Sequence, residues 1–271
     1  MAKNMSLTTM PSLGFGTWQM PGQTCYESVL DALALGYRHI DTAQMYGNEE
    51  EVGRAVADSP VPREEIWITT KVLPQNLHAD GIRSSAPESL ARLGTDYVDL
   101  LLVHWPVFGK APLEEVIRCM DEVRQRGEAR NVGISNFNSR QVARAAAVAP
   151  LFTNQVEYHP YLAQDAVLEA CRTAGLKLTA YCPLAQGKAV HDPVLAEIGE
   201  AHDASAAQVC LAWLLSQPDV VAIPKAASAK NRRANLGALD IQLSEGDMKR
   251  ISGLASSLRL CDPPSVRPDW D

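Results

Sequence analysis

Short apolar runs alternate with amphipathic segments along almost the whole chain, and this alternation restricts the possible folds more than any other feature. The runs predict eight strands, and their apolar character is typical of parallel strands that are buried on both faces. Eight such strands separated by about eight helices favour an α/β fold of the (β/α)8 TIM-barrel type, with a doubly wound open sheet as the alternative. The expected strands are residues 13–18, 38–41, 66–71, 98–105, 132–135, 154–157, 177–182 and 220–224.

Amphipathic segments with helical spacing lie between these runs. Thr24 and Glu27 fit a capping box at the start of a helix that is expected to stop at Gly36. Residues 79–93 also have helical spacing, but we expect a kink or a restarted helix at Pro87 because proline lacks the backbone N–H. Further helices are expected at 49–57, 113–126, 139–148, 165–174 and 206–216, after Ser228, and from near Ser244.

The open-sheet alternative lacks its usual sequence signal. No G-x-G-x-x-G motif follows an early strand, which weakens a doubly wound dinucleotide-binding fold. No low-complexity linker and no fixed-period repeat interrupts the alternation. Residues 1–271 are therefore predicted to form one barrel domain.

Composition argues against several classes of protein. No run of about 18 apolar residues is present, so no membrane span is expected, and residues 1–6 lack an apolar signal core. The net charge of −7 disfavours nucleic-acid binding, which requires a basic face. The six cysteines form no C-x-x-C pair, which indicates free thiols in a reducing compartment and not a disulfide framework or zinc site. A cytoplasmic protein is expected.

Four polar side chains stand at or just after the ends of three consecutive predicted strands. Asp41 ends the second strand and Tyr46 follows it in a loop, Lys71 ends the third strand, and His104 lies at the end of the fourth. In a barrel the carboxyl ends of all strands open on one face, so these side chains would converge. They predict a proton-transfer site that needs no metal. Lys71 would stabilise the tyrosinate and lower the pKa of Tyr46, Asp41 would hold Lys71, and His104 would orient a carbonyl oxygen.

The chain resembles the aldo-keto reductase family over essentially its whole length. The resemblance implies catalytic roles for Asp41, Tyr46, Lys71 and His104, with Tyr46 as proton donor to an aldehyde or ketone and a nicotinamide cofactor as hydride source. Within the family, the short substrate loops and residues 268–271 are most similar to bacterial 2,5-diketo-D-gluconate reductases, particularly the B type. The motifs that carry the resemblance are residues 36–43, 46, 48–49, 70–71, 96–100, 104–106, 133–137, 154–157 and 223–225.

The same resemblance implies a set of cofactor-binding residues. Amide and hydroxyl groups would hold the nicotinamide carboxamide, and a tyrosine would stack on its ring. A basic cluster after the last predicted strand would bind the adenosine 2'-phosphate, which favours NADPH over NADH, although Ala226 and Asn231 replace the family's usual serine and arginine. The implied residues are Ser135, Asn136, Gln155, Tyr181, Lys225, Ser228, Arg232 and Asn235.

The substrate pocket is expected to be lined by Trp18, Trp105 and Phe108, beside the catalytic residues and a carboxyl-terminal tail that carries Trp270. Leu73 stands where the family often has a tryptophan, which opens the pocket or changes its shape. Methylglyoxal, keto sugars and 2,5-diketo-D-gluconate are the expected class of substrate, and the protein is expected to be a monomer.

Two other functions remain open at this stage. A lysine at the end of a barrel strand could condense with a carbonyl, so Lys71 could serve a Schiff-base lyase. The chain could also be a non-catalytic module that binds a nicotinamide cofactor.

Overall fold

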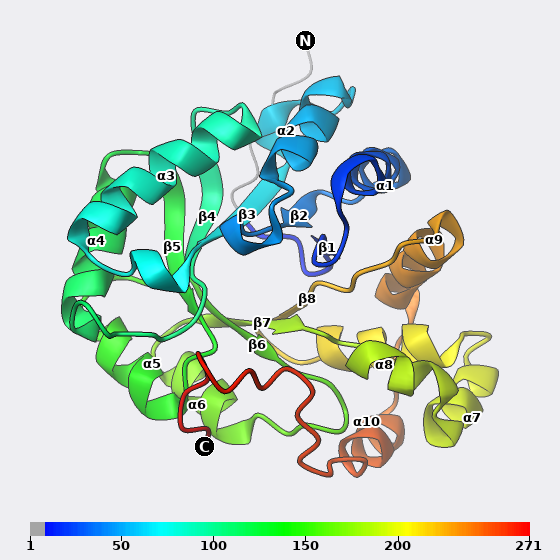
Figure 1. Ribbon diagram of the computed structural model, residues 1–271. Coiled ribbons are helices and arrows are strands. Elements are labelled where there is room, and N and C mark those ends of the chain that lie inside the picture. Colours follow the sequence, from blue (N-terminus) through cyan, green and yellow to red (C-terminus); the bar gives the residue numbers. More distant parts are fainter. Residues whose placement is uncertain (1–8) are drawn as a thin grey trace.

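The computed structural model describes residues 9–271, in which eight strands form one sheet with helices around it (Figure 1). Every neighbouring pair is parallel, and the strands follow one another in chain order. The predicted alternation is confirmed, and the doubly wound alternative is wrong because its strand order would reverse. The strands are β1 (Phe15–Gly16), β2 (His39–Asp41), β3 (Trp67–Val72), β4 (Val98–Val103), β5 (Ala129–Ser135), β6 (Thr153–Glu157), β7 (Lys177–Tyr181) and β8 (Val220–Ala222).

The sheet curls so that its two edges approach each other (Figure 1). Gly14 donates its N–H to the carbonyl of Ala222 at 2.8 Å, and Gly16 donates to the carbonyl of Pro224 at 3.1 Å. Leu13 and Ala222 form an isolated parallel bridge, so the contact between the first and last strands is short and not a full ladder. Eight parallel strands in a curled sheet with outer helices are consistent with the (β/α)8 architecture.

Helices follow the strands on the outer side of the sheet (Figure 1). The α-helices are α1 (Gly22–Leu35), α2 (Glu49–Asp58), α3 (Ala79–Leu93), α4 (Leu113–Gln125), α5 (Ser139–Ala146), α6 (Asp165–Thr173), α7 (Pro193–Ala201), α8 (Ala206–Leu215), α9 (Ala229–Leu236) and α10 (Glu245–Ser252). The 3-10 turns are η1 (Gln44–Tyr46), η2 (Arg63–Glu65), η3 (Pro74–Asn76), η4 (Ala185–His191) and η5 (Gly237–Asp240).

Two of the helix predictions are wrong in detail. Helix α1 begins at Gly22 after Pro21 and has no side-chain cap, so Thr24 lies inside the first turn and forms no capping box. Helix α3 is continuous through Pro87, so the predicted restart is wrong, while the alternative of a kink stays a prediction. The predicted stop of α1 is confirmed, since Gly36 adopts the left-handed conformation with φ 109°.

The period of two along the strands separates an inner from an outer cluster of apolar side chains. Leu100 and Leu102 of β4 pack in one cluster with Trp67, whereas Leu101 between them packs in the larger cluster that includes the helices. Val221 of β8 belongs to the cluster of Leu100 although β8 does not neighbour β4 in the sheet. That cluster therefore lies inside the curled sheet, and alternate residues of each strand point into it.

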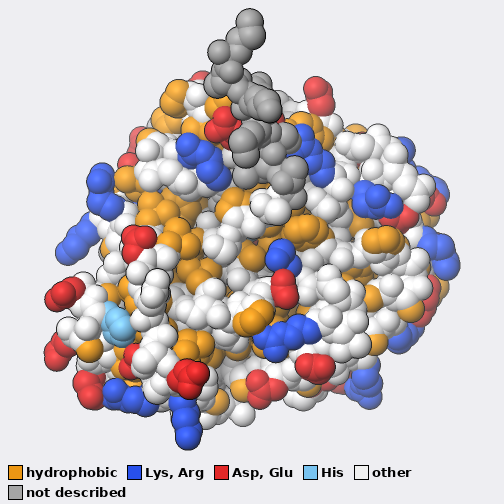
Figure 2. Space-filling view, turned by 180° about the vertical axis from the view of Figure 1, so that it is seen from behind, with side chains coloured by type: hydrophobic (Ala, Val, Ile, Leu, Met, Phe, Trp, Pro, Cys, Tyr) orange, Lys and Arg blue, Asp and Glu red, His pale blue; other side chains and the backbone are white. Residues whose placement is uncertain are grey.

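Charged side chains of both signs lie on the face that Figure 2 shows. On the face in Figure 2, basic side chains are scattered among acidic ones, and no continuous basic patch is visible among the described residues. Within residues 9–271, no helix combines the length and the apolar character that a membrane crossing requires.

Candidate active site

A buried ion pair lies at the end of the inner rows of β2 and β3. Lys71 stands four residues after Trp67 and so points to the same inner side, where its side chain is fully buried. Its Nζ atom lies 2.5 Å from Oδ1 of Asp41 and donates a second hydrogen bond to the carbonyl of Thr42 at 2.8 Å. A buried ammonium group keeps its charge only when it is paired in this way.

Tyr46 joins this pair from the 3-10 turn η1. Lys71 Nζ lies 3.4 Å from the Tyr46 hydroxyl oxygen and 4.9 Å from the centre of its ring. Gln44 fixes the turn because its Oε1 accepts the N–H of Leu73 at 3.0 Å and its Nε2 donates to Ser89 Oγ at 3.0 Å. The phenol therefore has a defined position beside the ammonium group.

His104 completes the group directly after β4. Its ring centre lies 5.7 Å from that of Tyr46, with the two planes at 76°. The imidazole is buried, and its Nδ1 atom has no hydrogen-bond partner in the part of the chain that the structure describes. Burial and the positive charge of Lys71 hold the pKa of His104 well below its usual 6.5, so the ring is neutral near pH 7.

The pKa directions of Tyr46 and Lys71 refine the expectation from sequence. Burial raises the pKa of Tyr46 above its usual value and outweighs Lys71, which lowers it. The expected net lowering is therefore wrong, although the expected effect of Lys71 itself is present. Burial alone would lower the pKa of Lys71, but Asp41 and Tyr46 raise it above its usual value. A Schiff base requires a neutral amine, so this site disfavours the lyase alternative.

Two of the expected carboxamide-binding residues are linked to the ion pair. Gln155 of β6 donates from Nε2 to Oδ2 of Asp41 at 2.8 Å, so both oxygens of that carboxylate are bonded. Ser135, the last residue of β5, donates from Oγ to the carbonyl of Gln155 at 2.8 Å. These side chains lie at the same end of the sheet as the catalytic group.

Asn136, a third expected carboxamide-binding residue, contacts both His104 and Tyr181. It adopts the left-handed conformation with φ 64°, which turns its side chain back over the strand ends. Its Nδ2 donates to the carbonyl of His104 at 3.0 Å, and its Oδ1 accepts the hydroxyl of Tyr181 at 2.8 Å. The structure therefore brings Ser135, Asn136 and Tyr181 together beside His104.

The basic segment after β8 divides into exposed and internal side chains. Lys225 and Ser228 are exposed, and Ser228 caps helix α9 by accepting the N–H of Asn231 at 3.2 Å. Asn235 is buried. Arg232 is buried as well and points away from this surface. It donates to Asp31 at 2.6 Å and to the carbonyls of Ala226 and Ala227 at 3.1 and 2.9 Å.

The expected pocket walls lie in different environments. Trp105 is buried and packs at 6.5 Å from the ring of Trp270, which the carboxyl-terminal segment carries over it. Trp18 is 46% exposed, and Phe108 packs edge-on against Phe137 at 5.7 Å. The carboxyl-terminal segment is held in turn by Asp271, which accepts hydrogen bonds from Ser139 at the start of α5, and by other contacts.

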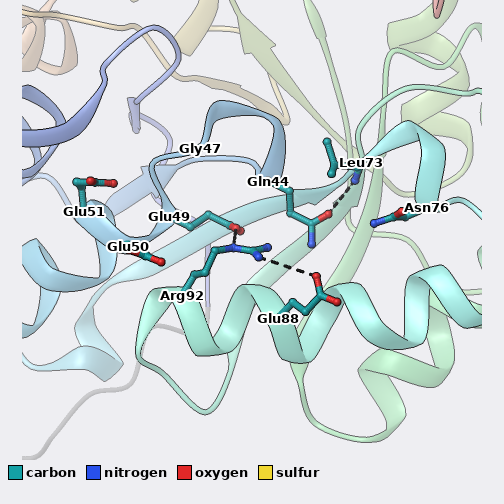
Figure 3. Close-up of a pocket in the computed structure, with 9 residues that line it drawn as sticks. All are labelled: Gln44, Gly47, Glu49, Glu50, Glu51, Leu73, Asn76, Glu88 and Arg92. Atoms are coloured by element: carbon teal, nitrogen blue, oxygen red, sulfur yellow. Dashed lines mark hydrogen bonds and ion pairs between the residues drawn. The ribbon is translucent and has the colours of Figure 1, made fainter.

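Sequence reasoning missed a supporting residue, Glu49, at the start of α2. Its Oε1 accepts the hydroxyl of Thr70 at 2.6 Å, next to Lys71, and its Oε2 binds Nε of Arg92 at 2.6 Å. Figure 3 shows this ion pair at the edge of a hollow of about 380 Å³ between η1, α2 and α3. None of the four proposed catalytic side chains lines this hollow. The sequence signal that could have found it is a glutamate at the start of a predicted helix, directly after the loop that follows a strand end.

Comparisons with known proteins agree with the fold and the site. The chain matches the Aldo/keto reductase family over residues 12–256. It is 41% identical over 267 residues to the methylglyoxal reductase DkgB of Salmonella typhi, covering 97% of this chain and 100% of that protein. Among solved structures it is similar to a protein provisionally assigned as 2,5-diketo-D-gluconic acid reductase B, with 45% identity, a TM-score of 0.94, and coverage of 97% and 94%. The aldose reductase of Schistosoma japonicum is 30% identical, with a TM-score of 0.87 and coverage of 93% and 90%.

The chain therefore belongs to the aldo/keto reductase family. It is an enzyme, an oxidoreductase of the class that reduces carbonyl groups with a nicotinamide cofactor. The predicted resemblance to this family is confirmed.

Proposed function

We propose that this enzyme reduces small dicarbonyls and keto sugars with NADPH, and that Tyr46 donates the proton. The observation that carries the proposal is a phenol 3.4 Å from a buried ammonium group. A neutral imidazole lies at its side, and within residues 9–271 its Nδ1 atom has no hydrogen-bond partner. A carbonyl oxygen placed between Tyr46 and His104 would receive a hydrogen bond from each. Methylglyoxal and 2,5-diketo-D-gluconate are suitable first substrates because the relatives' names refer to them.

Each of the four proposed catalytic residues would have a separate role in the reaction. His104 orients the carbonyl oxygen, and Tyr46 transfers its hydroxyl proton to that oxygen as negative charge develops there. Lys71 stabilises the resulting tyrosinate, while Asp41 keeps Lys71 charged and in place. The tyrosinate then takes a proton back from solvent. The bound nicotinamide supplies the hydride to the carbonyl carbon.

The cofactor site is proposed on the polar residues around His104 and on the segment after β8. Gln155 and Asn136 offer amide groups, and Tyr181 offers a ring, at the end of the sheet where the buried His104 Nδ1 lacks a partner. For the 2'-phosphate, the supporting features are the exposed Lys225 and the capped start of α9 at Ser228. Arg232 remains a proposed cofactor residue, although its internal bonds favour a role in shaping the loop of Ala226.

Four broader predictions accompany the proposal. We infer that the sheet closes as a (β/α)8 barrel, which the Gly14 to Ala222 bond supports, and that residues 1–271 form one domain. Residues 1–8 lie outside the described part of the chain. The monomeric state and the cytoplasmic location stay predictions.

The test follows the disappearance of reduced cofactor when the purified protein is mixed with methylglyoxal. Tyr46→Phe should lower kcat by about 10²–10⁴-fold while cofactor binding, measured by fluorescence, is unchanged. Tyr26→Phe, on the outer helix α1, serves as the control. Lys225→Ala should raise the KM for NADPH and leave that for NADH unchanged, whereas Lys249→Ala on α10 should affect neither.

Retention of most activity in Tyr46→Phe would remove the proposed proton donor. An equal loss with both cofactors in Lys225→Ala would remove the phosphate site. Cofactor binding without turnover of any carbonyl would favour the binding-module alternative.

A further inference from the structure

Two cysteines lie together beside the end of β7, although they are far apart in the sequence. Cys182 directly follows Tyr181, the last residue of β7, and Cys261 lies in the segment after α10. Their sulfur atoms and a carboxylate oxygen of Glu157 all lie within 4.8 Å of one another. The sequence, which contains no C-x-x-C pair, gave no sign of this contact.

Access also distinguishes this pair from the other cysteines. Cys182 and Cys261 are partly exposed, whereas the remaining four are buried. A reagent dissolved in water therefore reaches the paired sulfur atoms first. The buried cysteines are Cys25, Cys119, Cys171 and Cys210.

The hydrogen bond between the two thiols shifts their pKa values in opposite directions. A hydrogen bond from Cys261 lowers the pKa of Cys182 below its usual value, against the opposing effects of burial and Glu157, and the backbone N–H of Gln186 assists. The same hydrogen bond raises the pKa of Cys261, as do burial and Glu157. Since the thiolate is the reactive form of cysteine, Cys182 is the nucleophile of the pair.

The surroundings favour a dithiol over a metal centre. Oε1 of Glu157 accepts the N–H of Leu260, and Oε2 accepts the N–H of Cys261, each at 2.8 Å. Oε1 also lies 3.0 Å from Nε2 of the buried His159. Both carboxylate oxygens are thus engaged in holding the carboxyl-terminal segment, and they fix Cys261 opposite Cys182.

We propose that Cys182 and Cys261 form a reversible disulfide when the protein meets hydrogen peroxide. The Cys182 thiolate attacks one peroxide oxygen, the O–O bond breaks, hydroxide leaves, and Cys182 becomes a sulfenic acid. The Cys261 sulfur then attacks the Cys182 sulfur, the S–O bond breaks, and water leaves with the Cys261 proton. In sum, two thiols lose two electrons and two protons, and peroxide is reduced to two waters.

Only a small movement is required. The sulfur atoms must approach from within 4.8 Å to a bond length of about 2.05 Å, which rotation of the side chains and a shift of the segment around Cys261 can supply. The disulfide would join that segment covalently to the residue after Tyr181.

The effect on activity rests on the proposed function. The same segment carries Trp270 onto Trp105, and Tyr181 borders the proposed nicotinamide position. Closing the sulfur atoms to bonding distance displaces one or both of these edges. We therefore expect the oxidised enzyme to lose most of its turnover and to regain it after reduction with dithiothreitol.

The experiment treats the purified full-length protein with a small excess of hydrogen peroxide and then blocks the remaining thiols by alkylation. Free thiols should fall from six to four, and the intact mass measured before alkylation should fall by two hydrogen atoms. Peptide mapping without reduction should join the peptides that contain Cys182 and Cys261. In Cys261→Ser, Cys182 should stop at the sulfenic acid, which dimedone traps. In Cys119→Ala, a buried control, the cross-link should still form.

These readouts require no turnover, so they separate this inference from the proposed function. A preparation that forms the cross-link but shows no turnover even after reduction with dithiothreitol would count against the reductase proposal alone. Two results with active wild-type enzyme would overturn the disulfide proposal. One is a mass gain from added oxygen without any cross-link, and the other is a cross-link between other cysteines. Retention of one zinc ion by the reduced protein, lost in Cys182→Ser, would overturn it in favour of a metal site.

Discussion

Lys71 keeps a full positive charge where water cannot reach it. Its side chain is 0% exposed, and it forms an ion pair with the carboxylate of Asp41 at 2.5 Å. A buried ion pair adds little net stability compared with apolar side chains, but breaking it by removing one partner is costly. We therefore propose that the pair serves chemistry more than folding, since a neighbouring cation would help Tyr46 to release a proton in the proposed reaction.

Three variants separate these two roles. Asp41→Asn leaves the Lys71 charge buried without its partner, and Lys71→Met leaves the Asp41 carboxylate with only Gln155, so each should lose about 3–5 kcal/mol of unfolding free energy. The double variant has no charge at this buried site and should be more stable than either single variant. All three should lose most of their turnover. Urea unfolding and the cofactor assay measure the two effects separately.

The comparison among these variants decides the interpretation. If the double variant loses as much unfolding free energy as the two single variants lose together, the two side chains act independently. Recovery of turnover in the double variant would mean that the ammonium group is not needed for proton transfer.

Glu49 shows how a helix start can position a catalytic strand. Its carboxylate binds Thr70 of β3 and Arg92 of α3 from the first residue of α2, so three elements meet at one buried side chain. Figure 3 shows the ion pair of Glu49 with Arg92. Thr70 points to the outer side of β3, and its neighbour Lys71 points inward. Fixing Thr70 therefore fixes the register and direction of Lys71.

Glu49→Gln tests this positioning role. The amide keeps the shape of the side chain but loses the charge opposite Arg92, so the unfolding free energy should fall by about 1–3 kcal/mol. Turnover should fall several-fold, with the KM for cofactor unchanged, because Glu49 does not line the proposed cofactor site. Glu50→Gln, an exposed neighbour on the same helix, is the matched control and should change neither quantity. An unchanged kcat in Glu49→Gln would restrict Glu49 to a structural role.

Strand positions were readable from sequence because parallel strands buried on both faces are nearly continuous apolar runs. The expected strand at 98–105 overran β4 by two residues because Trp105 is apolar although it follows the strand. Helix α7 was missed, although Asp192 and Pro193 provide a cap and a favourable first residue. The expected helix starts at residues 49, 113, 139, 165 and 206 are confirmed, whereas the expected start of α1 is wrong because this helix begins at Gly22, after Pro21.

At the scale of the whole molecule, topology made the convergence of Asp41, Lys71 and His104 predictable. A parallel sheet in chain order sends every strand end to one side, whatever the details of packing. Contacts between loops that are distant in the sequence follow no comparable topological rule, so they could not be predicted. The Cys182 and Cys261 contact depends on the path of the chain after α10, and the inward position of Arg232 depends on how α9 packs on α1. Neither leaves a pattern in the local sequence.

The stability of the molecule should depend on pH through its buried imidazoles. His39 is fully buried beside Thr69, and burial lowers its pKa to about 4 despite the nearby Asp41, which raises it. In the unfolded chain the same group titrates near 6.5, so between pH 6.5 and 4 the unfolded state binds more protons than the folded one. The unfolding free energy therefore falls as pH falls through this range. His104 acts in the same direction.

Urea unfolding at about pH 7 and about pH 5 measures this effect, and His39 alone should account for about 2 kcal/mol of the difference. His39→Gln should be less stable than the wild type near pH 7, because the Thr69 contact is altered, but it should lose about 2 kcal/mol less on acidification. His191→Gln, at an exposed position, should show the full wild-type loss. An equal pH dependence in His39→Gln and the wild type would mean that His39 binds a proton in the folded state as readily as in the unfolded one. The acid sensitivity would then have to arise from His104 and the carboxylates.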